Sequence, residues 1–337
     1  MRLAVWCCAA ISFAAGCSKK SSHQLSPEVS GLAAVPASAE VVIVADVARI
    51  IDAPLVDRAV DQLLARDGGL ATRWKDLHDH CKVDAKTIKH VVLAIGPHVG
   101  PQPGTGPVLM VATGQLVETE LAACVRAMVG QGGGTLTARP LNDRTLYEAK
   151  DGNRVMYFAF GRPDTVILSA NEAFVTEALD GAGKKVLDNP DLAKWIGLAD
   201  QRAPLWAAGR VDDRVRQGLV KSSGGKLSAG PAAIVAAFDP TTGAKLSLGA
   251  IMTTEDDAKT LESFAKTQLG AFAMVAQAKS LGKIVDKVEI VADGTLVRFK
   301  VALDPDEVNQ LVSVLDGAGG SAKDTPPPTG SNGSAGP

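Results

Sequence analysis

Histidine, cysteine and acidic side chains are the residues of this chain that could carry acid–base or metal chemistry. His78, His80, His90 and His98 are the histidines of the region expected to fold, and His78-Asp79-His80-Cys81 brings three ligand types together. Zinc ligands usually come as separated pairs on different elements, and the chain offers no second group apart from His90 and His98. We therefore expect no metal site, and we expect His78 and His80 to complement the negative end of a helix dipole.

Motifs for nucleophilic catalysis and phosphate binding are missing from the sequence, which contains no G-x-S-x-G pentapeptide. Asp212-Asp213 and Asp256-Asp257 stand at expected helix starts, where carboxylates serve as caps. The glycine run 130–134 follows an expected helix and precedes a strand, the reverse of the order in a phosphate-binding loop. Gly225-Lys226 lacks the remaining residues of a P-loop. We expect no catalytic residue and no cofactor, and a protein that is not an enzyme.

The N-terminus has the parts of a secretory signal: Arg2, an apolar run over 3–13 and the small residues Ala14-Ala15-Gly16 before Cys17. The apolar run is shorter than the ~20 residues of a membrane-spanning helix. The segment resembles the lipobox of bacterial lipoproteins, with Ala14 in place of the usual leucine. This resemblance implies that residues 1–16 are removed and that Cys17 receives lipid, palmitate included. The alternative is an ordinary secretory signal with a chance cysteine.

Lipidation of Cys17 would fix where the protein works, because each buried CH₂ contributes ~0.8 kcal/mol and two or three acyl chains hold a protein on a membrane almost permanently. Residues 17–33 start with a polar stretch and are expected to form a flexible tether. Ser18 is not the aspartate that retains enteric lipoproteins at the inner membrane, so the resemblance favours the outer membrane, at its periplasmic face or the cell surface. The expected partners are membrane lipid and an unidentified envelope protein.

The cysteine count indicates a disulfide. Of five cysteines, Cys7 and Cys8 leave with the signal and Cys17 takes lipid, so Cys81 and Cys124 remain as an even pair in an oxidising compartment. A disulfide between them would contribute roughly 4 kcal/mol in the chain-entropy model. The alternatives are a metal-binding role for Cys81 and two free thiols.

Composition argues against nucleic-acid binding. The formal net charge is −2, and no cluster of lysine and arginine forms a basic stripe. Aromatic residues make up 4% of the chain, so stacking platforms for bases are scarce.

The order of expected elements repeats along the chain. In residues 34–182 the apolar patterns predict a strand, two helices, two strands, a helix, four strands and a closing helix. The ranges are 40–47, 54–64, 69–80, 88–95, 107–112, 118–129, 136–140, 145–149, 154–160, 165–169 and 171–179.

Residues 183–317 repeat much of this order in shorter form. The expected strands are 204–211, 232–238, 245–252, 288–292 and 295–301, and the expected helices are 212–220, 254–279 and one that starts at Asp304-Pro305. The amphipathic helix 254–279 is expected to pack on a sheet, with lipid or partner binding as the alternative. Residues 318–337 are expected to be a disordered Gly/Pro/Ser tail.

Several motifs of the folded region are shared with a group of uncharacterised envelope lipoproteins. These motifs are Val35-Pro36-Ala37-Ser38-Ala39-Glu40 before the first strand, the cysteine pair, and Leu179-Asp180-Gly181 and Leu315-Asp316-Gly317 at helix ends. In them the chain resembles such proteins, which are abundant in myxobacteria. The resemblance covers about residues 32–317. The group has no assigned activity, so the resemblance implies a fold type and a location, and no functional residue is transferred.

Together these patterns predict an α+β fold of two related halves, each a mostly antiparallel sheet covered by helices. The expected function is that of a lipid-anchored cell-envelope protein with a non-catalytic binding or structural role. The main alternative is an accessory protein of envelope transport or assembly that holds an apolar ligand between sheet and helices. The third is an enzyme of unrecognised type.

Overall fold

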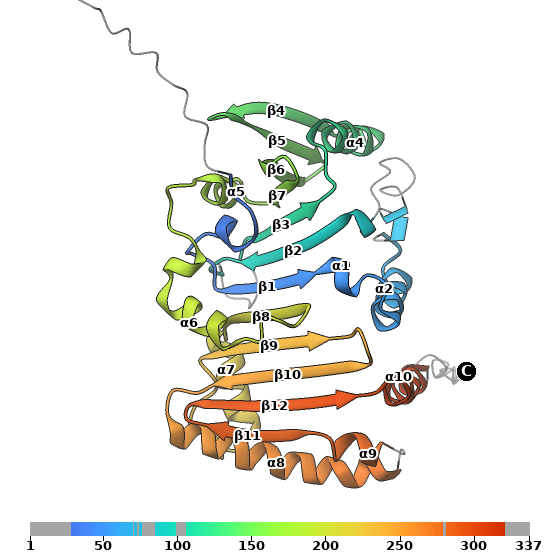
Figure 1. The fold of residues 1–337 in the computed structure, drawn as a ribbon, viewed down its shortest axis with the longest axis vertical. Coiled ribbons are helices and arrows are strands. Elements are labelled where there is room, and N and C mark those ends of the chain that lie inside the picture. Colours follow the sequence, from blue (N-terminus) through green and yellow to red (C-terminus); the bar gives the residue numbers. More distant parts are fainter. Residues whose placement is uncertain are drawn as a thin grey trace, which may run out of the picture.

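A single antiparallel sheet of twelve strands runs through the whole fold (Figure 1). The computed structural model describes residues 28–69, 71–72, 74–75, 85–98, 106–278 and 281–320. The strands are β1 Val41–Asp46, β2 Ile88–Ile95, β3 Val108–Gly114, β4 Thr135–Leu141, β5 Arg144–Asp151, β6 Arg154–Arg162, β7 Thr165–Ser169, β8 Leu205–Arg210, β9 Ala233–Asp239, β10 Ala244–Ile251, β11 Glu289–Asp293 and β12 Leu296–Leu303. Their order across the sheet is β11-β12-β10-β9-β8-β1-β2-β3-β7-β6-β5-β4.

Helices cover parts of both faces of this sheet. They are α1 Val47–Ile50, α2 Pro54–Arg66, α4 Glu118–Gln131, α5 Glu172–Leu179, α6 Pro190–Leu198, α7 Asp213–Ser222, α8 Glu255–Ala278, α9 Gly282–Val285 and α10 Pro305–Gly320, with short 3-10 turns at Gly31–Ala34, Ala85–Thr87 and Val186–Asp188. None of the helices in the described part of the chain has the length and apolar content that crossing a bilayer requires.

The α+β class is confirmed, but the strands of the two expected halves belong to one sheet. They are joined where β1 pairs with β8, and Val42 stands opposite Ala208 and Val44 opposite Trp206. These four side chains face the same core, because alternate residues of a strand share a face. The first strand of the chain therefore lies in the middle of the sheet.

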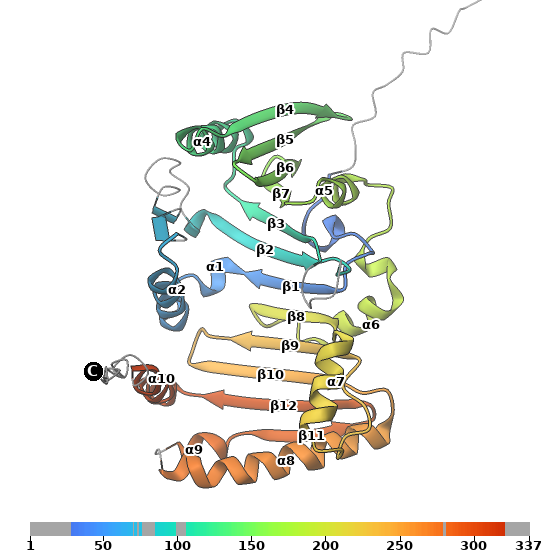
Figure 2. The ribbon, with the colours of Figure 1, turned by 180° about the vertical axis from the view of Figure 1, so that it is seen from behind.

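The two faces of the sheet are covered by different helices. On one face, called here the α5–α6 face, the largest apolar cluster packs β1, β2, β3, β8 and β9 under α5, α6 and the turn Gly31–Ala34. On the other, the α4–α8 face, α4 packs on β3 to β7, and α7 and α8 pack on β10 to β12. Figure 2 shows α7 crossing in front of β9, β10 and β12.

Most expected elements are present within a few residues of their predicted bounds. The strands 88–95 and 165–169 match β2 and β7 residue for residue. The capping box of α10 is formed: the Glu307 amide donates to Asp304 Oδ1 at 2.9 Å and the Asp304 amide to Glu307 Oε2 at 3.0 Å. Helix α10 extends to Gly320, beyond the predicted end at Leu315-Asp316-Gly317.

Other expectations fall on residues outside the described part, or differ from it. The signal 1–16, most of the tether 17–33, much of the helix expected at 69–80 and the tail after Gly320 lie outside the described residues. Helix α6 was not predicted, although Asn189 caps it and Pro190 begins it. Helix α8 packs on the sheet through Ala258 and Leu261, but Phe272, predicted on the same apolar line, is exposed.

Removing the cap of α7 gives a direct test of the role assigned to the acidic pair at 212–213. The Arg214 amide donates to Asp212 Oδ1 at 2.8 Å, so Asp212→Ala should lower the free energy of unfolding by about 1 kcal/mol. Asp213 pairs with Arg216 at 3.1 Å on an exposed surface, so Asp213→Ala should cost less than ~1 kcal/mol. Urea denaturation measures both, and a larger loss for Asp213→Ala would contradict the assignment.

Candidate functional site

An apolar strip crosses the middle of the α4–α8 face. Cross-strand pairing places Ile43 of β1 beside Leu93 of β2 and Ala207 of β8, which in turn lies beside Ala236 of β9. The rows on either side are also apolar. We call these residues the central apolar strip: Val41, Ile43, Ala45, Leu93, Ile95, Leu205, Ala207, Ile234, Ala236 and Phe238.

All ten side chains of the strip are half-buried, whereas their neighbours on the α5–α6 face are mostly buried. Helices α4 and α7–α8 pack over the strands on either side. In Figure 2, no helix of the described part of the chain crosses β1 or β2. The strip is therefore an apolar floor between two helical walls, and it contains no charged residue.

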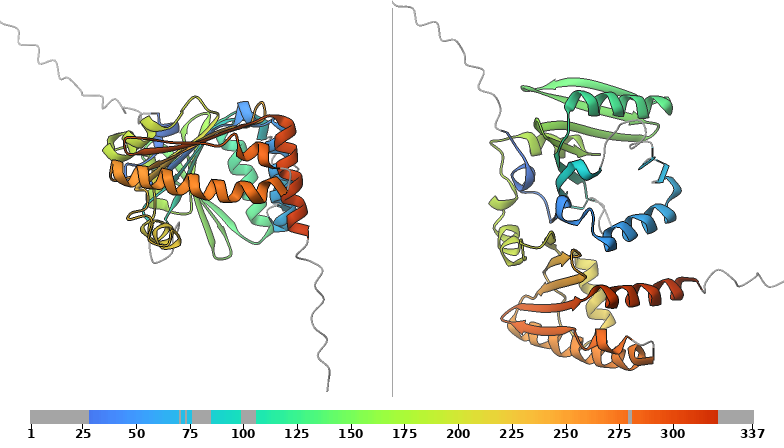
Figure 3. Two further views of the ribbon diagram at one scale, coloured as in Figure 1. Left: turned by 90° about the horizontal axis from the view of Figure 1, so that it is seen from below. Right: turned by 45° about the vertical axis from the view of Figure 1, so that its right-hand side comes forward.

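Helix α2 also has apolar side chains that the fold leaves partly open. The predicted helix is present, but none of its residues is buried and Leu63 is exposed. Leu55 alone joins a neighbouring cluster, formed by α9, α10 and the end of α8. Helices α2 and α10 project to the same side of the molecule (Figure 3, right panel). The apolar face of α2 thus contributes little to the core in this conformation.

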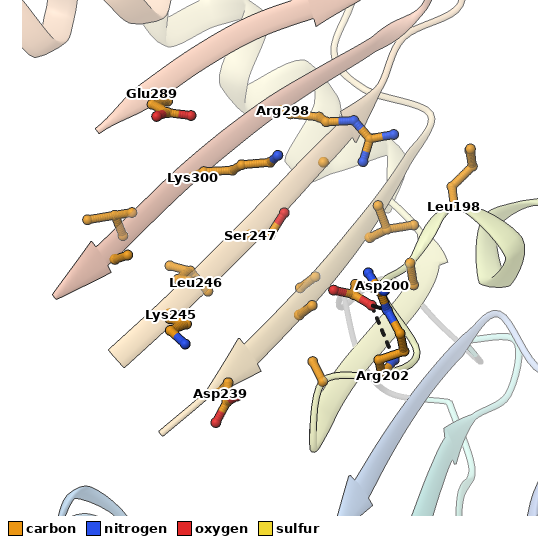
Figure 4. A pocket seen from close by; sticks show the side chains of 18 of the residues that line it. Leu198, Asp200, Arg202, Asp239, Lys245, Leu246, Ser247, Glu289, Arg298 and Lys300 are labelled. Carbon is orange, nitrogen blue, oxygen red and sulfur yellow. Dashed lines mark hydrogen bonds and ion pairs between the residues drawn. The ribbon is translucent and has the colours of Figure 1, made fainter. Parts of the chain in front are cut away.

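A second feature is a groove of about 1080 Å³ on the α5–α6 face, over β9, β10 and β12 (Figure 4). The loop that follows α6, with Asp200 and Arg202, forms one wall, and Lys287 and Glu289 form the other. Small apolar residues of β9 lie on the floor near the loop. Ser247, Arg298 and Lys300 supply polar groups from β10 and β12.

Two acidic groups of the groove, Asp200 and Asp239, are held as carboxylates by close donors. The Thr241 hydroxyl donates to Asp239 Oδ1 at 2.6 Å, and this hydrogen bond lowers the pKa of Asp239. The Arg202 guanidinium donates to Asp200 Oδ1 at 3.1 Å and lowers the pKa of Asp200 in the same way. These two carboxyl groups stay ionised near neutral pH, which does not favour a role as general acids.

The histidines singled out from the sequence are only partly in the described region. His98 lies with Nδ1 3.5 Å from Glu40 and Nε2 3.5 Å from Asp212, and His90 Nδ1 is 3.8 Å from Asp46. His78 and His80 lie outside the described residues. Among the residues that the structure does describe, no group of three or more His, Cys, Asp or Glu side chains is placed to hold a metal ion.

The cysteines singled out from the sequence are also only partly in the described region. Cys124 is buried on α4, with Sγ 3.9 Å from Met128 Sδ. Cys17 and Cys81 lie outside the described residues, so lipidation at Cys17 and the Cys81–Cys124 disulfide stay predictions.

Comparison with known proteins does not indicate a function for the chain. No protein-family model matches the chain, and no curated protein matches it. Among solved structures, the chain is similar to one titled "Structure of crystal form I of TP0453", with 11% identity and a TM-score of 0.46 over 86% of this chain and 97% of that one. The function must therefore be argued from the residues themselves.

Sequence reasoning missed both surfaces described above. The central apolar strip comes from strands that were predicted, but the strand order that brings their outward residues together does not follow from local patterns. The pair Arg298 and Lys300 stands two residues apart within a predicted strand, a spacing that puts both side chains on one face. That spacing was visible in the sequence.

Proposed function

We propose that this protein is a lipid-anchored cell-envelope protein that binds an apolar ligand, without catalysis, on the central apolar strip. The half-buried state of the strip is the observation that carries the proposal. Apolar area left in contact with water is unfavourable by about 25 cal/mol per Å². A lipid chain laid between α4 and α7–α8 would remove that area from water.

The apolar composition of the central apolar strip favours an acyl chain or a similarly apolar ligand. Binding sites for small molecules are mostly apolar, with a few polar groups that fix orientation. The strip has only aliphatic side chains and Phe238, so it offers contact area and no directional recognition. An anchor at Cys17 would keep this surface close to a membrane, at the outer membrane in the localisation we favour. An envelope protein that supplies or receives the ligand is the expected partner.

We also propose that residues 34–182 and 183–317 are related halves. The order β8-β9-β10-β12-β11 parallels β1-β2-β3-β7-β6, and α8 follows β10 on the same face as α4 follows β3. Strands β4 and β5 would then be an addition to the first half. Superposition of the two strand sets tests this relation: it should bring α4 onto α8 and α2 onto α7 together, and a fit of the strands alone would contradict it.

A charge placed at the end of the strip should weaken apolar binding. Val108 continues the strip beside Ile95 and its side chain is 48% exposed, so Val108→Lys should be tolerated by the fold. Desolvating the ammonium group would oppose a ligand there, and we expect Nile red to bind several-fold more weakly. Fluorescence titration with the neutral dye measures the change.

The matched control is Leu187→Lys, because Leu187 is 56% exposed and lies in the turn Val186–Asp188, which packs with α6 on the opposite face of the sheet. A second variant, Ile43→Thr, adds a hydroxyl at the middle of the strip and keeps a β-branched shape. Unchanged binding in both strip variants, with circular dichroism that matches the unmodified protein, would refute the proposal.

A further inference from the structure

The α5–α6 face loses its helical cover over the last strands of the sheet. Helix α6 contacts β8 and β9, and in the described residues no helix packs on this face over β10, β12 and β11. The residues there change accordingly. Where β8 and β9 present Trp206, Ala208 and Val235 to a core, β10 and β12 present Ser247, Lys300 and Arg298 along most of their length. Only at one end do Ile251 and Leu296 still join that core.

Two cations of this groove, Arg298 and Lys300, form no ion pair among the described residues, whereas Lys245 stands opposite the Asp239 carboxylate. Register places Lys300 opposite Ser247, and Arg298 opposite Gly249. Arg298 and Lys300 are two residues apart, so both side chains rise from the same face, as Figure 4 shows. These two positive groups repel one another, and an anion between them would relieve that repulsion.

Most of the other charged side chains of the groove have a partner. Arg202 pairs with Asp200 at 3.1 Å, Lys287 pairs with Glu307 at 2.5 Å, and Asp239 accepts two hydrogen bonds from Thr241. Glu289, opposite Lys300 in register, is the acidic residue of the groove without an ion pair in the described region. The charged groups that remain without an ion pair in the described residues are therefore Arg298 and Lys300 against Glu289, which leaves one positive charge in excess.

We propose that this groove binds the phosphate group of an amphipathic ligand. The Arg298 guanidinium offers a planar fork of donors, Lys300 a point charge, and Ser247 a neutral hydroxyl donor, a set that suits phosphate oxygens. The apolar floor near the loop after α6 accepts the apolar part of the same ligand. The groove lies on the opposite face from the central apolar strip, so this site does not depend on the function proposed above.

The experiment uses the full chain with Cys17→Ser, so that an acyl anchor does not dominate membrane binding. One arm titrates inorganic phosphate and follows it by ³¹P NMR. The other arm measures co-sedimentation with phosphatidylcholine vesicles, with and without phosphatidylglycerol. The variant Arg298→Gln/Lys300→Gln should weaken binding at least about tenfold, because it removes two charge-assisted contacts.

The matched control is Arg214→Gln/Lys221→Gln, which removes the same charge from α7 on the other face. Loss of phosphate binding in the β12 variant alone supports a soluble phosphate compound as the ligand source. Loss of phosphatidylglycerol-dependent sedimentation in that variant alone supports a lipid headgroup. Equal losses in both double variants, or no binding by the parent protein in either arm, would overturn the site.

Discussion

Replacing Trp206 with alanine is expected to lower the free energy of unfolding by about 3–5 kcal/mol, as for other large buried aromatic residues. Trp206 is 6% exposed and lies on β8, with Val44 of β1 opposite it on one side and Ala237 of β9 on the other. The substitution leaves a cavity where the two parts of the sheet meet. Denaturation in urea, followed by circular dichroism, measures the loss.

The control for this substitution is Trp74→Ala, because Trp74 is 45% exposed and its loss should cost less than ~1 kcal/mol. Unfolding should remain a single transition, since the β1–β8 ladder ties both parts of the sheet together. Two separate transitions, with only one shifted by Trp206→Ala, would contradict a continuous cooperative sheet.

Replacing Cys17 with serine is expected to move the protein from the membrane fraction to the soluble fraction almost completely. Without acylation the chain loses the ~0.8 kcal/mol per buried CH₂ that two or three acyl chains supply. Fractionation of cells with carbonate washing measures the distribution, and Ser18→Ala is the matched control. Continued sedimentation of the Cys17→Ser protein with membranes would contradict the anchor.

The elements that the sequence predicted well are those defined by local chemistry. The start of α10 follows from Asp304, Pro305 and Glu307, whose capping contacts depend on residues within one helical turn. Most of strand β2 follows from the apolar run Val91-Val92-Leu93-Ala94-Ile95. The same local signals are present for α6, which Asn189 caps and Pro190 begins, although this helix was not predicted.

The joining of the two parts into one sheet could not be predicted in this way. It depends on β1 meeting β8, more than 150 residues later in the chain, in a register that buries Val42 with Ala208. A slip of one residue would turn these side chains to the other face. Local periodicity does not say which strands become neighbours.

The candidate surfaces were hidden for a related reason. An outward apolar residue such as Ile43 gives the same alternating pattern whether a helix covers it or leaves it open. The exposure of Ile43 depends on which strands α4, α7 and α8 pack against. The two cations Arg298 and Lys300 were visible in the sequence, but it does not show that no helix of the described residues covers them.

The central place of β1 has a consequence for how the chain folds. As the chain is made from its N-terminus, β1 to β7 can pair before β8 exists, and β1 is then an unprotected edge strand. An open edge rich in Val and Ile residues is a template for pairing with another chain. This topology therefore requires that β1 does not pair with another copy of the chain before β8 pairs with it. A sheet whose first strand stayed at its edge would not have this requirement.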